Sequence, residues 1–165
     1  MLVPNLQLMY YLEKEIIVPA TLDECWEFFS SPANLSKITP KEMDFVITSN
    51  TEVGKMYPGM FITYTVRPIF GIKMKWVTEI TFVEKGKYFI DEQRVGPYKI
   101  WHHEHHFKSV EGGTLMTDKI YYLPPYGILG KLAQPIVVKP QLKKIFDYRE
   151  KMVKECFGER AVASE

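Results

Sequence analysis

Apolar and polar side chains alternate along two long parts of the chain, as they do in β-strands with one buried face. Between residues 8 and 18, one face of the expected strand carries five apolar side chains: Leu8, Tyr10, Leu12, Ile16 and Val18. Lys14 falls on the same face and is its charged exception. Between residues 43 and 123 the alternation continues and is interrupted at intervals by Gly and Pro, which predicts six successive antiparallel strands.

The clearest of these six strands covers residues 72 to 82. Its even-numbered residues form the expected inward face: Ile72, Met74, Trp76, Thr78, Ile80 and Phe82. The odd-numbered residues include Lys73, Lys75 and Glu79, which we expect to meet water. The pattern therefore predicts a sheet with one apolar face and one solvated face.

Two short segments after the first strand have helical signals instead. Thr21 and Glu24 have the spacing of a capping box, which predicts a helix that begins directly after Thr21. The buried stripe of this helix is apolar: Leu22, Cys25, Trp26 and Phe29. Ser31 and Pro32 suit the N-cap and the first position of a second short helix, which we expect to end before Pro40.

The C-terminal part of the chain predicts a long amphipathic helix. Residues at helical spacing form one stripe: Leu142, Ile145, Phe146, Arg149, Met152, Val153 and Cys156. Gly158 is placed to end this helix, and Pro135 and Pro140 predict a broken or kinked start. A helix that is apolar on one side and follows a meander of strands must bury that side against the sheet. We therefore predict an α+β fold in which an antiparallel sheet grips the C-terminal helix.

The composition favours one globular domain. The chain has 165 residues, of which 46% are hydrophobic and 25% charged, and we expect a single domain over residues 1–165 with an ordered core of about 8–158. Lys and Arg (21) nearly balance Asp and Glu (20), so we expect no nucleic-acid partner.

Cysteine usage and hydropathy bear on the compartment. Cys25 and Cys156 are too few for a disulfide framework, residues 1–7 do not resemble a signal peptide, and no apolar run approaches the roughly 20 residues that span a bilayer. We expect a cytoplasmic protein without stable membrane insertion. Five lysines give the last helix a basic side, which we expect to be a solvated face or a transient contact with a lipid surface: Lys139, Lys143, Lys144, Lys151 and Lys154.

All four histidines lie in one predicted strand. Alternation places four side chains of this strand on the inward face: Trp101, His103, His105 and Phe107. His102 and His106 fall on the outward face. The inward face of the next strand contains Met116, Asp118, Ile120 and Tyr122. For these faces to match across a hairpin at residues 111–113, Asp118 must lie opposite His103 or His105, within reach of a hydrogen bond.

The strand before the histidines adds further polar groups. We expect Asp91 and Gln93 to face inward, beside the same histidines. Three interpretations of this cluster compete: a satisfied buried network that fixes strand register, the polar anchor of a ligand pocket, or a general base made of a histidine and Asp118. A metal site of His103, His105 and Asp118 is a weaker fourth interpretation, and we expect no metal.

Several short motifs together resemble the START-like superfamily, which includes the Bet v 1 allergens, polyketide cyclases and lipid-transfer domains. The similarity is to a bacterial ligand-binding branch of that superfamily, and its motifs are Tyr11-Leu12-Glu13, Ile17-Val18-Pro19-Ala20, Trp26-Glu27-Phe28-Phe29, Asn34-Leu35, Ile38-Thr39-Pro40, Gly96-Pro97-Tyr98, Trp101-His102-His103-Glu104-His105, Gly113-Thr114, Asp118, Tyr122, Gly130 and Ile145-Phe146-Asp147-Tyr148-Arg149. The resemblance covers nearly the whole chain. It implies a helix-grip fold with seven strands, the first beginning at residue 8, and a cavity between the sheet and the C-terminal helix.

The resemblance also supports the inward placement of the polar cluster but implies no reaction, because this fold carries transfer proteins, receptors, cyclases and chaperone cofactors. No catalytic motif of the cyclases has a match in the chain, so whether the protein is an enzyme stays open. We expect it to bind an apolar or aromatic small molecule without a cofactor. The expected ligand-binding residues are Met74, Trp76, Asp91, Gln93, Trp101, His103, His105, Phe107, Met116, Asp118 and Tyr122. The alternatives are an acid-base enzyme that uses His103, His105 and Asp118, and a protein whose cluster is purely structural.

Overall fold

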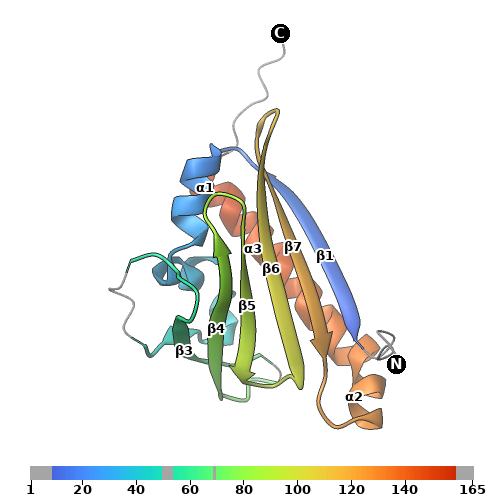
Figure 1. Cartoon of the computed structure of the whole chain (residues 1–165). Coiled ribbons are helices and arrows are strands. Elements are labelled where there is room, and N and C mark those ends of the chain that lie inside the picture. The colour runs from blue at the N-terminus through green and yellow to red at the C-terminus, as the bar shows by residue number, and fades with distance from the viewer. Residues whose placement is uncertain (1–8, 50–53, 69, 159–165) are drawn as a thin grey trace, which may run out of the picture.

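The computed structural model describes residues 9–49, 54–68 and 70–158 (Figure 1). The expected strand start at Leu8 and both ends of the expected domain lie outside these ranges. The strands are β1 (Tyr10–Val18), β2 (Val46–Ile47), β3 (Phe61–Val66), β4 (Met74–Glu84), β5 (Tyr88–Val95), β6 (Ile100–Val110) and β7 (Gly113–Leu123). The helices are α1 (Leu22–Phe29), the 3-10 helices η2 (Pro32–Ile38) and η3 (Lys41–Met43), α2 (Ile128–Ala133), the π-helix η4 (Gln134–Val138) and α3 (Lys139–Phe157).

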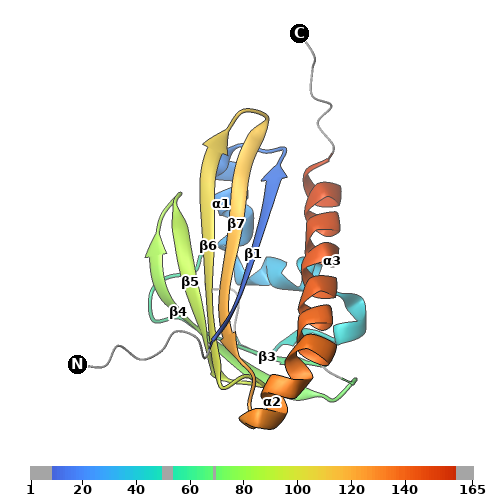
Figure 2. The ribbon, with the colours of Figure 1, turned by 90° about the vertical axis from the view of Figure 1, so that its right-hand side faces the viewer.

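The strands form one antiparallel sheet with the order β1-β7-β6-β5-β4-β3-β2. The first strand therefore crosses to pair with the last, and consecutive strands pair in between. Figure 2 shows α3 lying along one face of the sheet, with α1 on the same side. The predicted helix-grip fold, with seven strands around a long C-terminal helix and two short helices after the first strand, is confirmed.

The capping box forms at the start of α1. The backbone N–H of Thr21 donates to Glu24 Oε2 at 2.7 Å, and the backbone N–H of Glu24 donates to Thr21 Oγ1 at 3.3 Å. Cys25, Trp26 and Phe29 are buried on the sheet side of the helix. Ser31 and Pro32 stand at the predicted N-cap and first position of η2, although the Ser31 side chain makes no capping bond.

A β-bulge in β4 overturns part of the predicted inward face. Trp76, Thr78 and Ile80 are buried as predicted, but Phe82 is 40% exposed. Ile80 pairs with Asp91 and Phe82 pairs with Ile90, so one extra residue on β4 has no partner on β5. An extra residue reverses the alternation beyond it, which turns Phe82 to the outer face. Ile72, predicted inward, is also exposed, because it precedes the strand.

The C-terminal helix is close to its prediction. It ends at Phe157 with Gly158 as C-cap, and its start is continuous with the π-helical turn that contains Pro135. Cys156, predicted to lie on the buried stripe, is exposed. The helix repeats every 3.6 residues, so the stripe drifts, and Phe157 takes the inward position by packing on Phe28 and Phe29.

Lys14, the charged residue on the inward face of β1, points toward α3. Its Nζ lies 3.2 Å from Asp147 Oδ1 and 3.9 Å from Glu150 Oε2. The long side chain thus reaches from the edge strand to the exposed side of the helix, which explains the exception in the alternation.

None of the helices in the described ranges is both long enough and apolar enough to cross a membrane.

The turn between β6 and β7 allows a matched test of backbone packing. A Cβ on Gly113, where φ is +147°, would lie 2.1 Å from the carbonyl oxygen of Val18, whereas one on Gly112, where φ is +85°, would meet open space. We expect Gly112→Ala to lower the free energy of unfolding by about 1–2 kcal/mol through backbone strain alone. Gly113→Ala should lower it by about 3 kcal/mol or more. Urea denaturation measures the free energy of unfolding of both variants. Equal decreases would contradict the close approach between Gly113 and the Val18 carbonyl oxygen.

Candidate functional site

A cavity of about 170 Å³ lies between the sheet and the first half of α3. Its sheet side is aromatic and includes Tyr64, Trp76 and Trp101, and its helix side includes Leu142 and Ile145. Trp76 and Trp101 meet edge to face, with ring centroids 5.6 Å apart. The walls are therefore rigid and mostly apolar.

Polar side chains from three elements form one end of this cavity. Asp91 of β5, His103 and His105 of β6, and Arg149 of α3 all line it. The sheet register brings them together, because Asp91 pairs with His103 and His105 pairs with Asp118 of β7. The predicted placement of Asp118 directly opposite one of the two inward histidines is thus confirmed.

Asp118 lies behind the imidazoles, away from the cavity. Its Oδ1 is 2.9 Å from His103 Nε2 and 3.0 Å from His105 Nδ1. A carboxylate can only accept, so the imidazole nitrogens donate to it. His103, His105 and Asp118 are all at most 5% exposed. The carboxylate therefore holds both rings in one orientation.

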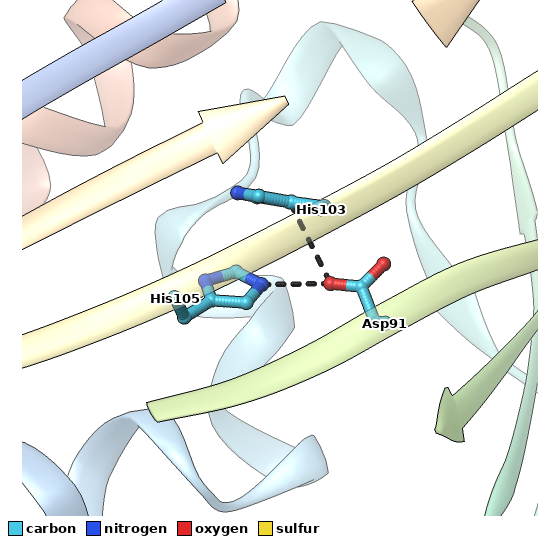
Figure 3. Close-up of side chains that lie close together, drawn as sticks. All are labelled: Asp91, His103 and His105. Atoms are coloured by element: carbon cyan, nitrogen blue, oxygen red, sulfur yellow. Dashed lines mark hydrogen bonds and ion pairs between the residues drawn. The ribbon is translucent and has the colours of Figure 1, made fainter. Parts of the chain in front are cut away.

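Asp91 points toward the two imidazoles from β5, as Figure 3 shows, and it lines the cavity. Its Oδ2 lies 2.7 Å from His105 Nε2 and 3.5 Å from His103 Nδ1. The Asp91 side chain is 16% exposed, against 5% for that of Asp118. Of the two carboxylates, Asp91 is the one that a bound molecule can contact.

Arg149 completes the cluster from the helix. Its Nη2 lies 3.6 Å from Asp118 Oδ1 and 3.4 Å from His105 Nδ1, and its guanidinium carbon lies 5.6 Å from the Phe29 ring centroid and 5.9 Å from that of Phe146. Its Nε is buried without a hydrogen-bond partner in the described part of the chain. Sequence reasoning placed Arg149 on the buried stripe but missed its role; a charged residue on an apolar stripe, facing inward carboxylates, was the available signal.

Burial and neighbouring charges set the protonation of the cluster. Burial raises the pKa of Asp118, but the Arg149 charge and the hydrogen bonds from both imidazoles outweigh it and hold this pKa well below its usual range. Burial likewise opposes ionisation of Asp91, yet the His105 hydrogen bond and the nearby positive charges lower its pKa. Both carboxylates are therefore ionised.

The two histidines shift in opposite directions. Burial lowers the pKa of His103, and the charge of His105 lowers it further. Burial also acts against a charged His105, but the hydrogen bonds to Asp118 and Asp91 raise its pKa. The raised pKa favours a protonated His105, which with Arg149 would balance the two carboxylates, and the lowered pKa favours a neutral His103. With its Nε2 donating to Asp118, His103 keeps an acceptor at Nδ1 near Asp91.

Five of the eleven predicted ligand-binding residues line the cavity: Trp76, Asp91, Trp101, His103 and His105. The other six do not line it: Met74, Gln93, Phe107, Met116, Asp118 and Tyr122. Met74 is half-buried at the start of β4. The Gln93 amide is occupied with the backbone of Tyr98, donating to its carbonyl at 2.6 Å and accepting from its N–H at 3.1 Å.

The remaining inward residues have packing roles. Phe107 and Met116 belong to the core beneath α1. Tyr122 packs in a separate cluster with Leu142 and Phe146, and its hydroxyl accepts a hydrogen bond from Gln134 at 2.9 Å. Facing inward thus did not suffice to reach the cavity, because α1 and α3 pack directly on other parts of the sheet.

The atoms that face the cavity include one potential metal-ligand set. Asp91, His103 and His105 each place one ligand atom within 4.8 Å of the others. The set weighed from sequence contained Asp118 in place of Asp91. The Asp118 carboxylate contacts the other nitrogen of each ring, and that set stays a prediction. This carboxylate occupies the position from which carboxylates orient metal-binding histidines. His105 Nε2 already lies within hydrogen-bond distance of Asp91, so a cation would have to replace that proton.

Comparison with known proteins identifies the fold. No family model matches the sequence, and no curated protein matches it. Among solved structures, the chain is similar to major latex-like protein 151 of Panax ginseng, with a TM-score of 0.67 and 15% identity over 92% of this chain and 99% of that one. The protein CV1439 of Chromobacterium violaceum gives a TM-score of 0.67 with 12% identity, covering 89% of this chain and 96% of that one.

The protein TTHA0849 of Thermus thermophilus has a TM-score of 0.64 and 14% identity, covering 90% of this chain and all of that one (100%). The latex protein is Bet v 1-like. The chain therefore has the fold of the START-like superfamily, as the motif resemblance predicted. Identities this low establish the fold alone.

Removal of the rear carboxylate tests the charge balance. Asp118→Asn leaves Arg149 and His105 partly uncompensated, so we expect the free energy of unfolding at neutral pH to fall by about 3–5 kcal/mol. In the native chain, stability from Asp118 is present above its unfolded pKa of about 3.8 and is lost as the pH falls toward its lower folded pKa. This acid-dependent loss should shrink in Asp118→Asn.

Chemical denaturation over a series of pH values measures both effects. Glu111→Gln, on the exposed β6–β7 turn, is the matched control and should behave like the native chain. An Asp118→Asn protein with native stability would show that the cluster does not depend on this carboxylate.

Proposed function

We propose that this protein binds an apolar or partly aromatic small molecule, such as a lipid, a quinone or a polyketide-like compound, in the cavity between the sheet and α3. The observation that carries the proposal is the composition of the cavity: mostly aromatic and aliphatic walls with a few polar side chains, among them the cluster of Asp91, His103 and His105. Small-molecule sites generally combine apolar walls with a few placed polar groups. We propose the cytoplasm as its compartment, and no nucleic-acid partner.

The size of the cavity limits what can lie wholly inside it. An engineered apolar cavity of about 150 Å³ holds a benzene molecule. The cavity of about 170 Å³ is therefore suited to one ring or a short chain. A larger ligand would place the ring that carries its polar group inside the cavity. The rest of the molecule would extend out past α3.

The polar end favours a ligand that carries a hydroxyl group. The Asp91 carboxylate and Nδ1 of neutral His103, 3.5 Å apart, are both acceptors at the cavity surface. A hydroxyl placed between them would donate to one and relieve the repulsion between their lone pairs. Phenols, hydroquinones and hydroxylated polyketide rings meet this requirement.

A second candidate function is acid-base catalysis on such a molecule. The observation that favours it is that the imidazoles of His103 and His105 line the cavity while Asp118 holds their far nitrogens. A general base needs this combination of access and orientation. Neutral His103 is the better base of the two, because its Nδ1 carries no proton.

The binding proposal is tested with 1-naphthol and naphthalene, which differ by one hydroxyl group. We expect 1-naphthol to quench the fluorescence of Trp76 and Trp101 and to bind at least about tenfold more tightly than naphthalene, since a hydrogen bond to a charged acceptor contributes about 1.5–3 kcal/mol. Asp91→Ala should remove this difference. Titration followed by tryptophan fluorescence measures all affinities.

Two further variants locate the binding. Ile145→Trp fills the cavity and should abolish binding of both probes, whereas Ile17→Trp, on the exposed side of β1, should change neither. If the folded native chain binds neither probe, or if Ile145→Trp binds as the native chain does, the proposal fails and the cluster is left with a structural role.

The enzyme candidate requires the natural ligand. Native mass spectrometry of protein purified from its own host identifies any retained small molecule. If the protein is an enzyme, the native chain should convert this molecule, and His103→Gln should abolish turnover while leaving affinity within about threefold, because the cavity walls are unchanged. A retained molecule that stays unconverted would rule against catalysis.

A further inference from the structure

Five large apolar side chains are exposed in one short stretch that follows β7. Tyr126, Ile128, Leu129, Leu132 and Ile136 are each between 64% and 83% exposed. We call these five residues the α2 face. Single exposed apolar side chains are ordinary on proteins, but a contiguous group marks a surface that contacts something else.

The fold itself does not need these side chains on the outside. The opposite side of the same stretch is packed: an added Cβ on Gly130 would lie 2.0 Å from the carbonyl oxygen of Pro125, in the loop that follows β7. Gln134 donates to the Tyr122 hydroxyl, and Val138 is buried against the core. With that side anchored, the α2 face points to solvent.

The segment that carries the α2 face contains basic residues and no acidic ones. Between Leu123 and Asp147 the sequence contains four lysines and no acidic residue. Lys131 lies on α2 itself, and Lys139 begins α3; both are exposed. Lys143 and Lys144 already pair with Asp147 and Glu42. An apolar helical surface with lysines among its side chains is the pattern of helices that lie in an anionic lipid interface.

The position of the α2 face in the fold also agrees with contact with a lipid surface. Figures 1 and 2 show α2 projecting at one end of the sheet, the end at which the β3–β4 connection also lies. That connection exposes Phe70 (82%) and Ile72 (61%), followed by exposed Lys73. The cavity-lining residues of α3 begin at Gln141, one helical turn beyond η4.

We propose that the α2 face docks on an anionic lipid bilayer, with its apolar side chains among the acyl chains and Lys131 and Lys139 at the headgroups. A second copy of the chain is a poorer partner. A two-fold contact through this face would bring each lysine close to lysines of the other copy, whereas anionic lipid neutralises them. Docking does not depend on the proposed function. Docking would also let the cavity ligand exchange with the bilayer, and only that exchange rests on the proposed function.

Vesicle co-sedimentation tests the docking. We expect the full chain to bind vesicles of equal parts phosphatidylcholine and phosphatidylglycerol, to bind pure phosphatidylcholine vesicles at least about tenfold more weakly, and to lose binding at high salt. Leu129→Ser with Ile136→Ser should weaken binding about tenfold or more, because two apolar side chains no longer enter the bilayer. Lys131→Gln with Lys139→Gln should weaken it about fivefold per lysine, on anionic vesicles only.

Matched control variants carry the same types of substitution on the strands and on the β4–β5 turn. Ile17→Ser with Val95→Ser, at 55% and 53% exposure, and Lys85→Gln with Lys108→Gln should bind like the native chain. Equal binding to neutral and anionic vesicles, or no binding, overturns the proposal. A dimer in analytical ultracentrifugation that the Leu129→Ser, Ile136→Ser pair dissociates would assign the face to a second copy instead. The same pair should retain 1-naphthol binding in solution, which separates failure of docking from failure of the proposed function.

Discussion

The buried carboxylate of Asp118 contacts donor groups from two other elements, β6 and α3, at once. Its Oδ1 lies 2.9 Å from His103 and 3.0 Å from His105 on β6, and 3.6 Å from Arg149 on α3. A buried charge left without its partners costs several kcal/mol, so the strand register and the position of the helix must satisfy this carboxylate together. The remaining features of the cavity follow from that arrangement.

With its rear nitrogens held by Asp118, the histidine pair presents its other nitrogens to Asp91 and to the cavity. The pKa of His105 is raised and that of His103 lowered, which favours a positive charge on His105 beside Arg149 and a neutral His103 with one nitrogen as an acceptor. The polar end of an otherwise aromatic cavity is thereby oriented before any ligand arrives. Such preorganisation lowers the cost of binding, and it would serve an anchor and a catalytic base equally.

The apolar residues of the chain serve two separate surfaces. Those of the sheet, α1 and α3 form the core and the cavity walls, whereas those of the α2 face lie outside. The division arises where the chain leaves β7, since Gly130 packs on the loop at Pro125 and Gln134 holds the inner side of the connection against Tyr122 of β7. An apolar exterior beside the cavity-lining turns of α3 is consistent with ligand exchange at a lipid surface.

The sequence by itself determined the seven strands, the capping box at Thr21 and the placement of Asp118 opposite His103 or His105, because a short hairpin with one buried face requires the inward faces to match. The structure decided that the residue opposite Asp118 is His105. The sequence could not show the bulge that turned Phe82 outward, since that depends on the fit between β4 and β5. It placed Asp91 and Gln93 inward alike, but it could not show that only Asp91 of the two lines the cavity or that Arg149 completes the charge balance. Those were decided by the packing of α3 across the sheet, which joins residues that no local pattern connects.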